Sequence, residues 1–215
     1  MKSKMKQLLW RIIRSGMGEF SERMMTGERM GKYLISVFCC CFFILACAFG
    51  SKNAEPPMEV VDFVDLDRYI GTWYEIARYP HYFQEGCVAT KAVYTQREDG
   101  KIDVLNQCRL EKLDGKEKSA KGKAWVVDKK TNAKLKVSFF WPFAGDYWII
   151  ELGENYEYAV VGHPERTYLW ILSRTPAMDR GLYEELIIRI KNKGYDTEKL
   201  LITPQAEVPQ PRSPL

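Results

Sequence analysis

Histidine is scarce in this chain of 215 residues, which contains only His81 and His163. Neither stands at metal-ligand spacing from a cysteine, so no zinc site is indicated. The sequence also lacks the Gly-x-Ser-x-Gly element of many hydrolases, and no Cys–His or paired-carboxylate arrangement stands out. Glu75 and Asp103 lie in predicted strands and are expected to be solvated or paired. These absences argue against an enzyme and against a metal or other cofactor.

An excess of charge is also absent from most of the chain. The formal net charge is +4, with 32 Lys and Arg against 28 Asp and Glu. Residues 1–32 contain eight Lys or Arg and three Glu, which leaves 24 basic and 25 acidic residues in the remainder. The basicity therefore belongs to the N-terminus, and the sequence predicts no nucleic-acid partner.

A long uncharged run spans residues 33–51. Basic residues precede it and a small residue ends its apolar part, which is the pattern of a secretory signal. The sequence Ile-Leu-Ala-Cys at 44–47 resembles a bacterial lipobox, in which cleavage before the cysteine frees it for lipid attachment. We expect this processing at Cys47. An uncleaved anchor helix, for which the run is long enough, and ordinary secretion are the alternatives.

The export segment is expected to comprise residues 1–46, and Met30 is a second candidate start that leaves a short basic region. Ala48 follows the cysteine where some lipoproteins have aspartate, and this resembles an outer-membrane destination. We therefore expect lipid anchoring to the bacterial outer membrane, with the folded domain facing the periplasm. Residues 47–61 are expected to be a lipidated tether, and the proline-rich residues 205–215 an extended tail.

Short β-type runs divided by turn residues fill the expected domain, residues 62–204. Eight are predicted, at 71–79, 88–96, 101–109, 119–127, 134–140, 147–152, 156–162 and 168–173. A helix capped by Asp179 and ended by Gly194 follows, and then a short run at 199–203 that pairs back onto the sheet. This order predicts an all-β fold, either an antiparallel up-and-down barrel or a sandwich. A barrel of eight strands has an interior wide enough for one small ligand.

Two motifs favour the barrel. Gly-Thr-Trp at 71–73, after a short helical turn, resembles the first signature of the lipocalins, and the run 168–176 is similar to their last-strand signature. The middle signature is degenerate at 153–156. The resemblance covers about residues 63–205 and is to the bacterial outer-membrane and apolipoprotein D branch of the family. It implies an eight-stranded barrel, the lipocalin calyx, with one C-terminal α-helix packed outside.

The signatures also imply how one end of the barrel is closed. Trp73 is expected to plug it, next to Gly71. Arg174 is expected to stack over the indole while its guanidinium bonds loop carbonyl oxygens. These three residues have a structural role in this interpretation and no catalytic one.

The resemblance, with the alternation of strand residues, implies which side chains line the calyx. They are Tyr94, Asn106, Trp141, Tyr147 and Trp170. Tyr94 and Asn106 are expected to face each other across the hairpin turned at Asp99-Gly100. An aromatic wall with few polar groups suits an amphipathic ligand, and the alternative is that these aromatics only fill the core. Phe83 and Phe143, in flanking loops, are expected at the mouth against ligand or membrane.

Past Cys47 only two cysteines remain, Cys87 and Cys108. Both lie toward the open ends of the same predicted hairpin, and an exported protein meets an oxidising compartment. The two arms differ by about four residues, so a bridge between them requires a bulge or a bent strand. We expect a disulfide on that condition.

The favoured function is non-enzymatic. We expect a lipocalin that stores or transports a hydrophobic ligand, such as a fatty acid or a lysophospholipid, at the bacterial envelope. A lipid-modifying enzyme on the same barrel is one alternative, and a structural envelope lipoprotein with a filled barrel is another. The sequence leaves open whether the chain forms a homodimer.

Overall fold

The computed structural model describes residues 56–206, which belong to one compact unit, residues 55–215. The predicted export segment, the candidate start at Met30 and the predicted lipidation site Cys47 lie outside the described residues, as do residues 207–215 of the predicted tail.

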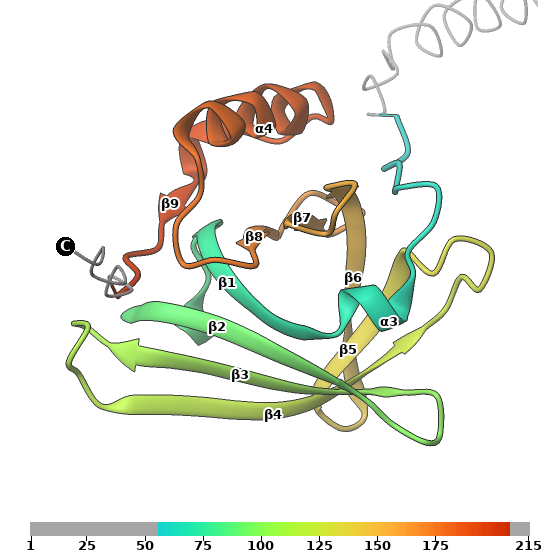
Figure 1. The fold of residues 1–215 in the computed structure, drawn as a ribbon, viewed down its shortest axis with the longest axis horizontal. Coiled ribbons are helices and arrows are strands. Elements are labelled where there is room, and N and C mark those ends of the chain that lie inside the picture. The colour runs from blue at the N-terminus through green and yellow to red at the C-terminus, as the bar shows by residue number, and fades with distance from the viewer. Residues whose placement is uncertain (1–55, 207–215) are drawn as a thin grey trace, which may run out of the picture. The chain divides into compact units, whose positions relative to one another are not determined.

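Within residues 56–206, nine strands form one sheet in the order β2-β3-β4-β5-β6-β7-β8-β1-β9, and β1 also pairs with β2 (Figure 1). The first eight strands therefore close into an antiparallel up-and-down barrel, as predicted, and a sandwich is excluded. The strands are β1 (Gly71–Arg78), β2 (Cys87–Gln96), β3 (Ile102–Leu110), β4 (Glu117–Val126), β5 (Lys134–Phe140), β6 (Phe143–Leu152), β7 (Tyr158–Gly162), β8 (Leu169–Ser173) and β9 (Leu201–Ile202).

The two ends of the barrel differ. In an up-and-down barrel, alternate connections lie at opposite ends. The helical turn α3 (Leu66–Tyr69) and the connections after β2, β4 and β6 lie at one end, which we call the closed end. The connections after β1, β3, β5 and β7 lie at the other end, which we call the mouth. The first of these contains the 3-10 turn η1 (Tyr82–Gln84).

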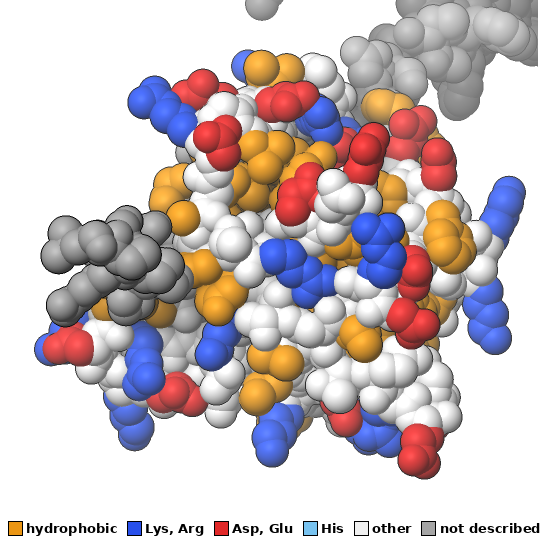
Figure 2. Space-filling model, viewed as in Figure 1, with side chains coloured by type: hydrophobic (Ala, Val, Ile, Leu, Met, Phe, Trp, Pro, Cys, Tyr) orange, Lys and Arg blue, Asp and Glu red, His pale blue; other side chains and the backbone are white. Residues whose placement is uncertain are grey.

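Helix α4 (Arg180–Asn192) packs against the outside of the barrel (Figure 1). Asp179 is its N-cap, and its side chain accepts a hydrogen bond from the Leu182 backbone N–H. Figure 2 shows hydrophobic side chains gathered between α4 and the barrel. This outer core contains Ile150, Val160, Leu169, Ile171, Leu186 and Ile190, all buried. The helix is therefore held by its apolar face, as the sequence predicted.

A second core fills part of the barrel interior, where alternate strand residues point inward. Its buried members include Trp73, Tyr94, Val104, Ala124, Leu135, Ile149, Val161 and Leu172. Because the compact unit has both an interior core and an outer core, we expect residues 55–215 to fold without the preceding segment.

The end of the chain completes the barrel wall. β9 pairs with the last part of β1, which confirms the predicted return of the final run. Gln205 then donates from Nε2 to the backbone oxygens of Glu75 in β1 (2.7 Å) and Thr90 in β2 (2.9 Å). Gln205, predicted to begin the extended tail, is therefore bonded into the wall where β1 and β2 are no longer paired.

The described part of the predicted tether is packed against the barrel. Met58 is buried in the outer core, and Val61 N–H donates to the oxygen of Ile149 (3.1 Å). Pro56 accepts a hydrogen bond from Arg166 in the connection after β7 (2.8 Å). Met58 thus buries its side chain against the barrel, whereas Pro56 is exposed and is held through its backbone oxygen. Among the described residues, no helix has the length and apolar character needed to cross a membrane.

Candidate ligand-binding site

The closed end is plugged by Trp73, which is fully buried. Its indole N–H donates to the backbone oxygen of Tyr69 (2.8 Å). The guanidinium carbon of Arg174 lies 3.8 Å from the centre of the Trp73 ring. Arg174 also donates to the backbone oxygens of Ile70 (3.0 Å) and Thr72 (3.1 Å). The Trp73 indole and the Arg174 guanidinium therefore fix the loops at this end, which is a structural role.

Gly71 is required beside this plug for two reasons. Its φ is +100°, a backbone conformation that side chains with a Cβ rarely adopt. A Cβ placed on it lies 3.3 Å from Nη1 of Arg174. The glycine therefore gives the Arg174 fork the room to reach the carbonyl groups.

Three tyrosines meet in the interior next to the plug. The hydroxyl of Tyr147 lies 2.8 Å from that of Tyr69 and 3.0 Å from that of Tyr94. Burial raises the pKa of all three phenols, that of Tyr94 to about 12, so they are neutral at physiological pH. Tyr94 and Tyr147 point inward as predicted. Tyr69 was not predicted, and the only signal was its place in the helical turn before Gly71.

Asn106 also faces the interior, further along β3 toward the mouth. It lies opposite Ala92, whereas Tyr94 lies opposite Val104. The prediction that Tyr94 and Asn106 face each other is therefore wrong, although both belong to the inner face. A hydrogen bond from Arg97 N–H to the Lys101 oxygen (2.9 Å) closes a wider turn than Asp99-Gly100 alone, and this turn sets the register.

Two polar atoms of the interior are buried without a hydrogen-bond partner among the described residues. They are Oδ1 of Asn106 and Oγ1 of Thr90. Thr90 lies on β2, two residues from Ala92, the partner of Asn106. A buried polar atom that is left unpaired costs roughly 1–3 kcal/mol. These atoms are therefore candidate contacts for a polar group of a ligand.

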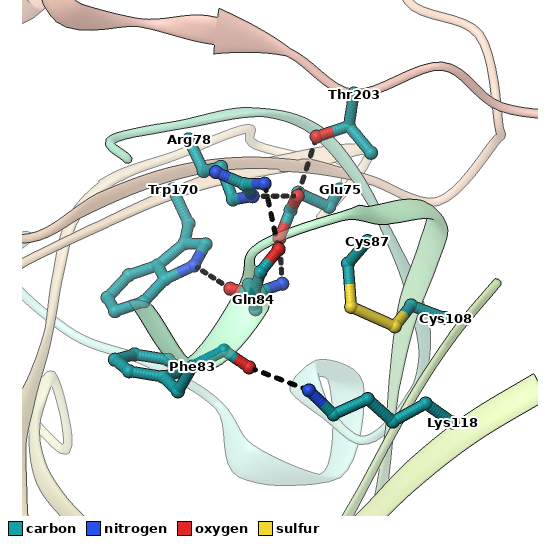
Figure 3. The surroundings of a disulfide bond; sticks show 9 residues. All are labelled: Glu75, Arg78, Phe83, Gln84, Cys87, Cys108, Lys118, Trp170 and Thr203. Carbon is teal, nitrogen blue, oxygen red and sulfur yellow. Dashed lines mark hydrogen bonds and ion pairs between the residues drawn. A yellow bond between two sulfur atoms is a disulfide. The ribbon is translucent and has the colours of Figure 1, made fainter. Parts of the chain in front are cut away.

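A chain of hydrogen bonds joins the mouth connection to the wall (Figure 3). Trp170 donates from its indole to Oε1 of Gln84 (3.1 Å), and Gln84 donates from Nε2 to Glu75 (2.8 Å). Glu75 also accepts from the Thr203 hydroxyl (2.6 Å) and forms an ion pair with Arg78 (3.2 Å). Burial raises the pKa of Glu75, and these donors oppose the shift.

Both carboxylates singled out in the sequence are thus paired. Glu75 is bonded to Arg78, and Asp103 on the surface forms an ion pair with Arg97 (3.1 Å). Within residues 56–206, no three side chains of the metal-binding types lie close enough together to hold an ion.

A disulfide joins Cys87 and Cys108 at the mouth, with 5.5 Å between the two Cα atoms (Figure 3). The register of β2 against β3 shifts between Val88 and Lys91, and Ala89 in this bulge has a φ of 47°. The bulge takes up one residue of the difference between the two arms, and Cys87, whose strand partner is Leu110, reaches Cys108 diagonally. The predicted disulfide and the condition attached to it are both confirmed.

The barrel geometry agrees with the comparison against family models. A model described as "Lipocalin-like domain" matches residues 64–205. The chain belongs to the lipocalin family.

Individual relatives agree with this assignment. The outer membrane lipoprotein Blc of Vibrio cholerae is 42% identical over 172 residues, which are 80% of this lipocalin and 98% of that protein. Temperature-induced lipocalin-1 of Arabidopsis thaliana is 42% identical over 161 residues, 71% and 85% of the two chains. The solved structure of insecticyanin from Manduca sexta superposes with a TM-score of 0.58 at 21% identity, over 71% and 86% of the chains. This structural likeness shows the fold.

The remaining predicted residues lie at the mouth of the lipocalin. Trp170 faces inward beneath η1. Trp141 does not line the interior, and that prediction is wrong, because its side chain is 83% exposed. The ladder between β5 and β6 ends at the pair Phe140 and Phe143, which leaves Trp141 in the turn beyond the wall. Phe83 is partly exposed and stacks on His81, with 3.8 Å between ring centres.

Proposed function

We propose that this lipocalin binds one amphipathic lipid, a fatty acid or a lysophospholipid, inside its barrel. The observation that carries the proposal is the pair of unpartnered inward atoms, Asn106 Oδ1 and Thr90 Oγ1, between the tyrosine cluster and the mouth. A hydroxyl, ammonium or protonated carboxyl group of the lipid donates to Asn106 Oδ1, and the Thr90 hydroxyl donates to an oxygen of the same polar group. The hydrocarbon chain packs on the apolar inner wall. Family membership supports a hydrophobic ligand at this place.

The proposed wall is made of side chains from several strands. Tyr94, Tyr147 and Trp170 contribute aromatic surface, and Asn106 contributes the amide. Inward aliphatic residues complete it, among them Val104, Ala124, Leu135 and Val137. Hydrocarbon buried against such a surface is stabilised by roughly 25 cal/mol per Å². The proposed wall would thus provide affinity through its apolar area and orientation through a few polar atoms.

The proposed location is the outer membrane, through lipidation of Cys47. The Ile-Leu-Ala-Cys sequence at 44–47 supports it. So do relatives that are named outer membrane lipoproteins, including Blc of Escherichia coli K12 at 38% identity over 170 residues. The folded unit then faces the periplasm.

We propose no chemical turnover. Glu75 is the buried carboxylate at the mouth, and its oxygens are occupied by Arg78, Gln84 and Thr203. Hydrolysis of esters or phospholipids by the purified protein that is lost in Glu75→Gln would contradict this and favour an enzyme.

A binding titration tests the ligand proposal. Residues 48–215, which contain the whole compact unit, are titrated with palmitic acid and with lysophosphatidylethanolamine. We expect one site, and a loss of affinity of roughly threefold to tenfold in Asn106→Leu and in Thr90→Val, the value of one hydrogen bond. Gln107→Leu is the matched control, because it makes the same replacement on the neighbouring residue of β3, whose side chain bonds Glu117 on the outside. Absence of binding to both lipids would contradict the proposal.

A further inference from the structure

Exposed aromatic side chains gather at the end of the β5–β6 hairpin. Phe140 is 81% exposed, Trp141 83% and Phe143 77%. With Pro142 they form what we call the aromatic tip. Soluble proteins rarely expose adjacent large apolar side chains unless the patch has a partner. Trp141 in particular was predicted inside the barrel and instead points away from it.

Other connections at the same end carry similar residues. Tyr82, in the connection after β1, is 84% exposed, and Leu113, in the connection after β3, is also exposed. Among the described residues at the closed end, two large hydrophobic side chains are exposed, Val127 and Phe63, which precedes α3. The apolar surface of the connections is therefore concentrated around the mouth.

Basic residues lie next to the aromatic tip. Lys121 and Lys123 of β4 line the same groove as Trp141. The one carboxylate of that groove, Asp103, is already paired with Arg97. Three lysines, Lys101, Lys121 and Lys123, line the groove against this one carboxylate. A surface of aromatic rings beside an excess of lysines matches the border of an anionic bilayer, where rings sit among the headgroups and lysines are attracted to phosphates.

The start of the described chain lies at this end as well. Pro56 is bonded to Arg166 in the connection after β7, which is a mouth connection. Pro56 is nine positions after Cys47, with eight residues between them. A fully extended segment of that length reaches at most about 32 Å. A lipid anchor at Cys47 would therefore hold Pro56 within about 32 Å of the membrane surface.

We propose that the mouth docks on an anionic lipid bilayer, with the aromatic tip entering the headgroup layer and Lys121 and Lys123 contacting phosphate groups. The docked barrel opens toward the membrane, so the ligand passes between bilayer and interior without crossing water. The route rests on the proposed lipid-binding function. The docking contact itself depends only on the tip and the two lysines.

Vesicle sedimentation tests the contact without the anchor. Residues 48–215, which lack Cys47, are mixed with vesicles of phosphatidylcholine alone or with one quarter phosphatidylglycerol. We expect binding to the anionic vesicles, and a partition coefficient at least tenfold lower in Trp141→Ser/Phe143→Ser. Lys121→Gln/Lys123→Gln should lower it about 25-fold, since each lysine near an anionic surface contributes roughly fivefold. Near-UV circular dichroism verifies that each variant is folded.

A matched control uses the closed end of the same barrel. Lys129→Gln/Lys130→Gln removes two exposed lysines from the connection after β4 and should leave vesicle binding unchanged. Brominated phospholipid in the vesicles should quench wild-type fluorescence more than that of Trp141→Phe. Equal binding by the tip variants, the lysine variants and the control would overturn the proposal, as would equal quenching.

Two further outcomes distinguish the docking proposal from the proposed binding of a lipid inside the barrel. A protein that binds palmitic acid but ignores anionic vesicles overturns the docking and leaves the ligand proposal standing. A protein that binds vesicles through the tip but takes up no lipid overturns the ligand proposal only. Sedimentation velocity without vesicles detects a dimer. A dimer that Trp141→Ser/Phe143→Ser abolishes, with no vesicle binding, would assign the tip to a second copy of this chain.

Discussion

Tyr147→Phe removes one hydroxyl group from the interior but affects two partners. The Tyr147 hydroxyl is bonded to both Tyr69 and Tyr94, whereas the Tyr94 hydroxyl is bonded to Tyr147 alone. Tyr147→Phe therefore breaks two hydrogen bonds and leaves two buried hydroxyls without their partner. Tyr94→Phe breaks one, and Tyr147 keeps its bond to Tyr69.

The magnitude follows from these counts. One buried hydrogen bond contributes about 0.5–1.5 kcal/mol to stability. Tyr94→Phe should thus lower the free energy of unfolding by about 1 kcal/mol, and Tyr147→Phe by about 2 kcal/mol. For a domain of this size, 2 kcal/mol corresponds to a fall in Tm of about 4–8 °C.

Urea denaturation at pH 7.5, followed by tryptophan fluorescence, measures both variants. Burial raises the pKa of the three phenols, so none of them titrates near this pH in either state. Tyr74→Phe is the control, because Tyr74 follows Trp73 on β1 and points to the opposite face. If Tyr147→Phe is no more destabilising than Tyr94→Phe, the shared hydroxyl is not the centre of the cluster and the reasoning fails.

Three other predictions concern the mouth and the plug. Cys87→Ala/Cys108→Ala removes a disulfide between residues 21 apart in sequence. Because the unfolded chain gains loop entropy, the free energy of unfolding in urea should fall by about 3 kcal/mol, and an unchanged midpoint would contradict this. Gly71→Ala should lower the free energy of unfolding by about 1–3 kcal/mol, because it places a Cβ at a positive φ and against the Arg174 guanidinium. A fall in Tm of less than 1 °C would argue against that contact. Burial lowers the pKa of His81 from 6.5 to about 4, so the unfolded chain binds the proton first and native stability is lost as pH falls from 6.5 toward 4. Stability measured across this range should fall further in the wild type than in His81→Phe, and parallel curves would refute the assignment.

The closed end was predictable because its requirements are local. A glycine with positive φ, a plug of indole size and an arginine after the last barrel strand each need one residue type at one position, as at Gly71, Trp73 and Arg174. The disulfide was predictable for a similar reason, since only two cysteines remained and they lay on one hairpin.

The calyx wall was predicted less well, because parity along a strand says nothing about where the strand ends. Trp141 directly follows β5, but the pairing of β5 with β6 ends at Phe140 and Phe143, before it reaches Trp141. Thr90 shares the inward parity of Ala92, so alternation along β2 could have predicted it. The position of Gln205 depends on a gap between β1 and β2, which no local pattern records.

We propose that a single lipid occupies the barrel with its polar group at Asn106. Native mass spectrometry of residues 48–215, purified without detergent, tests it most directly. We expect a species heavier than the apoprotein by one fatty acid or lysophospholipid, less abundant in Asn106→Leu and undiminished in Gln107→Leu. A protein that carries no lipid, and remains unbound after incubation with both lipid classes, would contradict it and favour a barrel filled by its own side chains.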